Sequence, residues 1–189
     1  VREALLPPLN EALGLPSYSS QMTRFNHRFW KQVPGQQETN LIYLEQESLV
    51  RELILRNHLD SETFVRSLLS DAAIQESIET HFSGIMGAFD TTKGKGTFLF
   101  WGIENGRRIA LSRGDSRMGS IDAIREGLQS GSLMPSILLS FIVISFYYGI
   151  TCGGGFSQVN YLTDMKTAFI NLLSEHQLLD QFPHLADLE

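Results

Sequence analysis

Between Glu126 and Asp164 the chain reads GLQSGSLMPSILLSFIVISFYYGITCGGGFSQVNYLT, residues 127–163, without a single charged side chain. The first half of this segment is almost wholly apolar, and the second half contains three consecutive glycines. Residues 135–148 predict a helix, because proline suits a first helical turn and Gly149 suits a C-terminal stop. Apolar residues occupy every side of this helix, so we expect it to be buried at the centre of the fold.

A helix without a polar face is either the core of a folded domain or a membrane span. About 20 apolar residues are needed to cross the hydrocarbon, and this run is shorter, starts at a proline and includes three serines. No cluster of Lys or Arg flanks it, so the positive-inside rule has nothing to act on. We therefore expect a buried central helix and no membrane partner.

The composition of the 189 residues narrows the class of protein. Hydrophobic residues make up 42% and charged residues 19%, a balance typical of globular proteins. The net charge of −6 argues against a nucleic-acid partner, since phosphate contacts need clustered Lys and Arg. The single cysteine cannot form an intrachain disulfide, and no secretory signal is recognisable, so we expect a cytoplasmic location. The chain starts at Val1 rather than at a methionine, which leaves open whether it is a fragment of a longer protein.

Two β-prone runs, residues 97–103 and 107–111, flank the pair Asn105-Gly106. This arrangement predicts a β-hairpin with a type I′ turn, in which both central residues need positive φ. Residues 40–44 predict a further strand. We therefore predict an α+β fold that is predominantly helical. Its small antiparallel sheet, hairpin 97–111 plus the strand near 40–44, packs against helices that include the fully buried helix 135–148.

Helical spacing of apolar residues accounts for most of the remaining chain. The expected helices run from Pro8 to about residue 15, over 22–33 (where a strand is the alternative), over 47–59, after a cap at Asp60 or Ser61, after a cap at Asp71, from a cap at Ser120 to Gly131, and after a cap at Thr163. We expect residues 1–189 to form one globular domain, with a peripheral helix and loop at 1–20 and a loosely held acidic tail at 175–189.

Cys152 is the first candidate for chemistry, because Gly153, Gly154 and Gly155 follow it directly. Consecutive glycines can turn several backbone N–H groups toward one point, as an oxyanion or phosphate site requires. A thiolate there could act as a nucleophile if a base lay beside it. Two arguments oppose this role: free cysteines usually pack in cores, and the negative end of a helix raises the pKa of a thiol.

His81 is the expected base, since it lies on the apolar face of a predicted helix. A lone inward histidine is more often a hydrogen-bonded core residue than a base. Tyr147 and Tyr148 end the central helix, so we expect them among the walls of a pocket at residues 151–156. The histidines show no metal-ligand spacing, so no metal site is expected, and nothing in the sequence names a cofactor.

Two polar segments favour an anionic partner only weakly. The lysines of loop 90–96 do not form a Walker A motif, but the loop could close over an anionic ligand. Four arginines gather around the hairpin, which could hold a carboxylate or a phosphate: Arg107, Arg108, Arg113 and Arg117. For both segments a solvated surface is the alternative reading.

We therefore expect a small-molecule-binding domain, with thiol-dependent group transfer at residues 151–156 as its chemistry. Apolar walls with few polar groups are what ligand sites usually offer. The alternative is a non-catalytic interaction or structural domain of a larger protein, which docks through helical faces and the aromatic segment 25–30. Whether the chain is an enzyme, and whether it forms a homo-oligomer, stays open at this stage.

Overall fold

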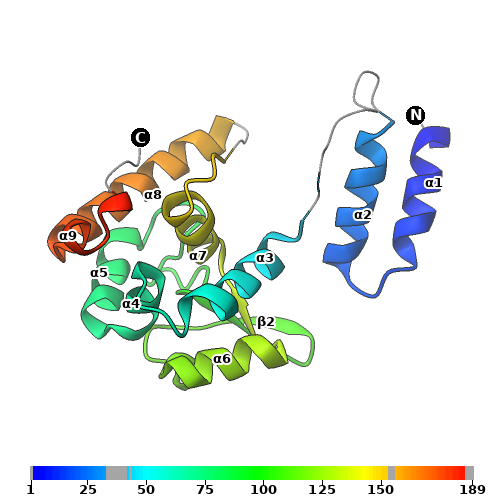
Figure 1. The fold of residues 1–189 in the computed structure, drawn as a ribbon. Coiled ribbons are helices and arrows are strands. Elements are labelled where there is room, and N and C mark those ends of the chain that lie inside the picture. The colour runs from blue at the N-terminus through cyan, green and yellow to red at the C-terminus, as the bar shows by residue number, and fades with distance from the viewer. Residues whose placement is uncertain (1, 33–41, 43, 153–155, 186–189) are drawn as a thin grey trace. The chain divides into compact units, whose positions relative to one another are not determined.

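The structure is a computed structural model that describes residues 2–32, 42, 44–152 and 156–185 (Figure 1). The chain divides into two compact units, Val1–Leu49 and Val50–Glu189. The boundary falls within the helix Gln46–Leu53 (α3), which continues as a π-helical segment, Ile54–His58. That residues 1–189 form a single domain stays a prediction.

The first unit contains two helices, Arg2–Leu13 (α1) and Tyr18–Trp30 (α2), that pack against each other. The helical reading of residues 22–33 is confirmed as far as Trp30. The expected start of the first helix at Pro8 is wrong, because α1 begins six residues earlier and includes both Pro7 and Pro8. Proline has no backbone N–H, so α1 lacks two hydrogen-bond donors in its interior.

The second unit is mostly helical. Its α-helices, besides the end of α3 and the central helix, are Phe64–Ser70 (α4), Ala72–Phe82 (α5), Ile121–Ser130 (α6), Phe156–Glu175 (α8) and Leu178–Gln181 (α9), with short 3₁₀ turns at Ser116–Met118 and Pro183–Leu185. Asp71 and Ser120 cap α5 and α6 as expected, and Gly131 ends α6 with φ of 75°. Leu178 and Leu185, in the expected tail, are buried in the core.

Two expected helix caps are wrong. The cap of α4 is Thr63, whose side chain accepts a hydrogen bond from the backbone N–H of Arg66, and neither Asp60 nor Ser61 fills this position. Thr163 lies in the interior of α8 rather than at its start. Its hydroxyl donates to the carbonyl of Val159 one turn earlier, which is how threonine is accommodated inside a helix.

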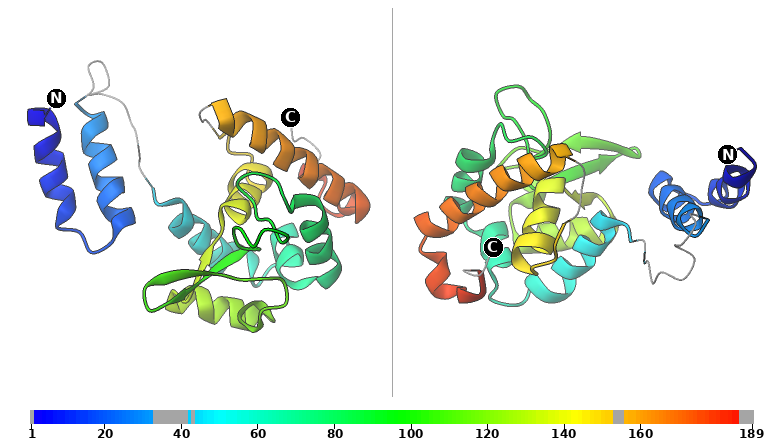
Figure 2. Two further views of the ribbon diagram at one scale, coloured as in Figure 1. Left: turned by 180° about the vertical axis from the view of Figure 1, so that it is seen from behind. Right: turned by 90° about the horizontal axis from the view of Figure 1, so that it is seen from above.

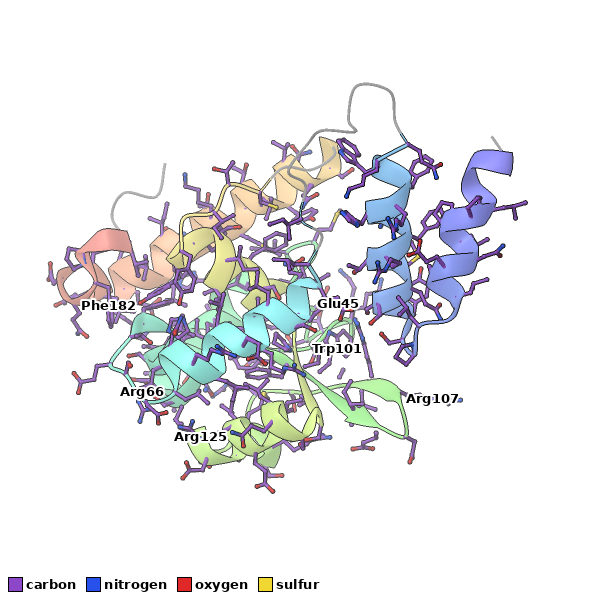
Figure 3. The ribbon with its side chains drawn as sticks, turned by 45° about the vertical axis from the view of Figure 1, so that its right-hand side comes forward. Glu45, Arg66, Trp101, Arg107, Arg125 and Phe182 are labelled. Carbon is purple, nitrogen blue, oxygen red and sulfur yellow. The ribbon has the colours of Figure 1, made fainter. Side chains whose placement is uncertain are left out.

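Three antiparallel strands form the sheet, in the order β2-β1-β3: Phe100–Glu104 (β1), Arg107–Ala110 (β2) and Leu133–Pro135 (β3). Asn105 and Gly106 connect β1 to β2 with φ of 50° and 73°, which confirms the type I′ turn. Figure 3 shows Arg107 at the turn end of this hairpin.

The third strand differs from the expected one. The strand expected near residues 40–44 falls largely on positions outside the described residues, and β3 takes the third place in the sheet. Pro135 is therefore not in the first turn of the central helix but ends β3, where it pairs with Phe100. A proline is tolerated there because β3 is an edge strand with one side free of ladder hydrogen bonds.

The central helix begins after Ser136, whose side chain accepts from the N–H of Leu139. It runs as an α-helix over Ile137–Phe141 (α7) and then as a π-helical segment over Ile142–Tyr147. Its burial is confirmed except at its ends, since Ile137 is 51% exposed. The members with no exposed surface are Leu138, Leu139, Ile142 and Val143.

Aromatic contacts join the central helix to α8, and both views in Figure 2 show the two helices side by side. The rings of Phe146 and Phe169 stack at 5.0 Å between centroids, and those of Phe141 and Tyr161 lie 6.2 Å apart. Contacts of this kind add to the free energy gained by burying the rings. Among the described helices, none combines the length and apolar character needed to span a membrane.

Gly127 of α6 permits the close approach of this helix to β3. A Cβ atom at position 127 would lie 2.6 Å from Cγ of Leu133, far inside van der Waals contact. We expect Gly127→Ala to lower the free energy of unfolding by about 1–3 kcal/mol, because overpacking outweighs the gain of up to about 1 kcal/mol in helix propensity. Urea unfolding measures the change. The matched control is Gly14→Ala, where a Cβ would meet nothing within 4 Å. Equal stability of the two variants would contradict this packing.

Candidate functional site

Cys152, the expected nucleophile, is exposed. Its described partner is Gln158, whose Nε2 lies 3.4 Å from Sγ. Gly153, Gly154 and Gly155 lie outside the described residues, so the expected cradle of backbone N–H groups stays a prediction. A carboxamide is not a base, so the described residues place no proton acceptor on this thiol.

His81 lies on α5, but its side chain is 24% exposed and bonds to the end of α8. Its Nε2 lies 2.7 Å from Oε2 of Glu175, and Ser77 donates to the other oxygen of the same carboxylate. The hydrogen bond from His81, and then the one from Ser77, holds the pKa of Glu175 below its ordinary value. No hydrogen bond joins His81 to Cys152 in the described part of the chain, and their expected pairing stays a prediction.

Tyr147 and Tyr148 meet a different histidine, His58, at the end of the π-helical segment that follows α3. The Tyr148 hydroxyl lies 3.1 Å from Nε2 of His58 and accepts a hydrogen bond of 2.9 Å from Nδ2 of Asn57. The Tyr147 ring meets the His58 ring edge-on, with 5.0 Å between centroids. On its other side, His58 places Nδ1 3.0 Å from Oγ1 of Thr63.

His58 is 1% exposed, and its surroundings are uncharged among the contacts described above. Burial disfavours the imidazolium form and lowers the pKa of His58 from 6.5 to about 4. The ring is therefore neutral at pH 7, with one nitrogen as a hydrogen-bond donor and the other as an acceptor.

The sequence carried a signal for this histidine that the apolar pattern alone does not include. Val50, Ile54 and His58 are spaced four residues apart, which places them on one helical face, and all three are buried. His58 and Tyr147 also end the two π-helical segments of the described chain. Segments of this kind occur frequently at functional sites.

A separate cavity of about 350 Å³ lies between residues 89–98 and 110–113, and we call it the loop cavity. Its apolar side consists of Phe89, Phe98 and Leu111, which are all buried. The two phenylalanine rings meet edge-to-face at 5.5 Å between centroids. This volume lies within the usual range of small-molecule sites.

Four charged residues line the loop cavity: Glu79, Asp90, Lys95 and Arg113. Nε of Arg113 donates to Glu79 at 2.8 Å, and Lys93, just outside the lining, lies 3.0 Å from Asp90. Hydrogen bonds from Thr92, and then from Lys93, hold the pKa of Asp90 well below its ordinary value. Lys95 forms no ion pair with another described residue, so one positive charge on the rim is uncompensated.

Two further hollows are bordered by residues of which none is buried. One, of about 410 Å³, lies between α4 and the segment around α9, next to the labelled Arg66 and Phe182 (Figure 3). The other, of about 490 Å³, lies in the first unit beside Arg24 and Glu45. Without a buried apolar wall, neither offers the environment that ligand sites usually have.

Within the described residues, no group of three or more His, Cys, Asp or Glu side chains is arranged to hold a metal ion. Comparison with known proteins adds no relative: no family model, no curated protein and no solved structure matches the chain. The functional argument therefore depends on the loop cavity and the His58 cluster alone.

The buried neutral state of His58 predicts a pH dependence of stability. Because its folded pKa lies below its unfolded pKa, the unfolded chain binds the extra proton first, and stability falls as the pH drops from about 6.5 to about 4. The shift corresponds to a loss of up to about 3 kcal/mol. We expect urea unfolding at pH 7 and pH 4.5 to show a larger loss for the native chain than for His58→Gln, which cannot be protonated. Parallel losses in both chains would show that His58 is not held neutral by burial.

Proposed function

We propose that the second unit binds a small molecule in the loop cavity, with an apolar body against Phe89 and Phe98 and one acidic group toward Lys95. The observation that carries the proposal is a cavity of ligand size with a buried aromatic wall and an uncompensated cation on its rim. Apolar walls with a few placed polar groups are the usual composition of such sites.

Hydrogen bonds within the loop support a preformed site. The backbone N–H groups of Asp90 and Lys95 each donate to the carbonyl of the other, at 2.8 and 3.0 Å. The Asp90 carboxylate also accepts from Thr92 Oγ1 at 2.6 Å and from the N–H of Lys93 at 3.0 Å. A loop held in this way loses little conformational freedom on binding, which favours affinity.

The charges of the cavity favour a singly charged anion as ligand. Glu79 neutralises Arg113, and Asp90 neutralises Lys93, so only Lys95 remains for the ligand. Arg113 uses Nε toward Glu79, and its terminal nitrogens are further donors that a carboxylate could accept from. A ligand with several negative charges would meet Glu79 and Asp90 at close range, which disfavours it.

Lys95→Gln tests the proposed role of this charge. Benzoate and its uncharged isostere benzamide are titrated into the native chain, and amide shifts of Lys95, Gly96 and Ser112 are followed by NMR. We expect benzoate to bind about three- to tenfold more tightly than benzamide, and the advantage to vanish in Lys95→Gln. Lys31→Gln, an exposed lysine that does not line the cavity, should keep it. If neither probe shifts these amides saturably, or both bind equally, the proposal fails.

Thiol-dependent transfer at residues 151–156 receives less support. Gln158 is the described partner of Cys152, and His81 is engaged by Glu175. We retain a reducing, cytoplasmic location as a proposal, since an exposed free thiol persists best where disulfides are rare.

A second candidate function, self-association, is favoured by one observation in the first unit. Leu6, Leu9 and Leu13 recur at helical spacing on α1 and are all exposed. A pair of helices of this size buries too little apolar surface to be stable alone, so this stripe needs a partner surface. A second copy of the same helix pair would supply one of matching character.

Replacing the stripe distinguishes a dimer from a monomer. We expect the native chain to show a concentration-dependent mass in analytical ultracentrifugation, and Leu9→Ser with Leu13→Ser to be monomeric at every concentration, because the apolar contact is lost. Asn10→Ser with Gln32→Ser, two exposed polar positions of the same unit, is the control and should still associate. A native chain that stays monomeric would rule out this second function.

A further inference from the structure

Tyr148, His58 and Thr63 are connected in series by hydrogen bonds, and Asn57 adds a fourth contact at the Tyr148 oxygen. We propose that these residues form a nucleophile–base–orienting triad, in which the Tyr148 hydroxyl accepts an acyl group from an activated ester or thioester. This site is separate from the loop cavity, with which it shares no residue.

The geometry meets the usual requirements for an activated nucleophile. Nucleophile and base lie within hydrogen-bond reach at 3.1 Å, and a third group orients the base from its other nitrogen at 3.0 Å. Thr63 is itself held in place as the cap of α4, through the N–H of Arg66. The edge-on Tyr147 ring restricts rotation of the imidazole.

Exposure is distributed as the proposed chemistry needs. Tyr148 is 38% exposed and can meet a substrate, whereas His58 is covered and shielded from bulk water. Because burial keeps His58 unprotonated, its base form is present throughout the neutral and mildly acidic range. The N–H of Asn57 points at the oxygen that becomes negative during the reaction, where a donor stabilises charge.

The proposed step balances as a simple acyl transfer. The Tyr148 oxygen bonds to the acyl carbon, the bond from that carbon to the alkoxide or thiolate leaving group breaks, and His58 Nε2 takes the phenol proton. The same nitrogen then gives this proton to the leaving group. Thr63 acts only as a positioning residue, since it touches neither the acyl group nor the leaving group.

Two tautomers of neutral His58 fit the observed distances, and only one of them activates Tyr148. In the active form Nδ1–H donates to Thr63, and Nε2 accepts from the Tyr148 hydroxyl. In the other form Thr63 donates to Nδ1, and Nε2–H donates to the Tyr148 oxygen, so His58 cannot take the phenol proton. An experiment on the native chain distinguishes the two.

The probe is p-nitrophenyl acetate, with acetylated tyrosines located by mass spectrometry from pH 5 to pH 8. Tyr18, at 76% exposure, is the internal reference for an unassisted tyrosine. An unassisted phenol reacts through its phenolate, whose fraction falls tenfold for each pH unit below a pKa of about 10. We expect Tyr148 to react at least about tenfold faster than Tyr18 at pH 7, and the ratio to grow as the pH falls, because His58 stays deprotonated.

Variants separate the base from a merely structural contact. His58→Gln should bring Tyr148 to the rate and pH slope of Tyr18, Thr63→Ser should keep the native profile, and Thr63→Val should lose part of it. Circular dichroism establishes that each variant is folded, and if His58→Gln does not fold, the native pH profile decides alone. Acetylation that follows exposure at every pH, with Tyr18 ahead of Tyr148, would overturn the triad.

Discussion

The structure of the second unit depends on the burial of one uncharged helix, residues 137–147. Its apolar side chains cover nearly the whole circumference, so surfaces on several sides must cover it. The aromatic rings of α8 cover one side, and α4 contacts the π-helical end. Ser136, which precedes this helix, donates its N–H to the carbonyl of Leu99, so the start of the helix is attached to the residue before β1.

This attachment explains how sheet and helix are placed together. Chain leaving α6 passes through β3 beside β1 and then turns directly into the central helix. The far end of that helix carries Tyr147 and Tyr148, which contact His58. A burial requirement at the middle of the helix thus positions a polar cluster at its end, where π-helical segments from two parts of the sequence meet.

The features that could be predicted from the sequence are those decided by neighbouring residues. The Asn105-Gly106 turn and the caps Asp71 and Ser120 follow from the conformations and hydrogen bonds of these residues themselves. The start of the central helix could not be predicted in this way, because Pro135 is drawn into a strand by pairing with Phe100. A three-residue strand is too short to show a period.

The candidate sites were harder to predict for a related reason. Tyr147 and Tyr148 were expected in a site, but their partner His58 is about 90 residues earlier in the chain, and no local pattern relates them. The same holds for the loop cavity, whose walls come from a loop and from the end of β2. The expectation that loop 90–96 could hold an anion is retained in the proposed function through Lys95.

The π-helical geometry has a consequence for how this chain tolerates changes in length. Each residue of an α-helix advances by about 100° around the axis, and a π-helical turn holds about one residue more than an α-helical turn. Loss of one residue within 142–147 would let the segment relax to regular α-helix. Everything downstream would then rotate by roughly a quarter turn. The core contacts of the earlier residues would survive, while the tyrosines would swing away from His58. Deletions here thus threaten the polar cluster before they threaten the fold.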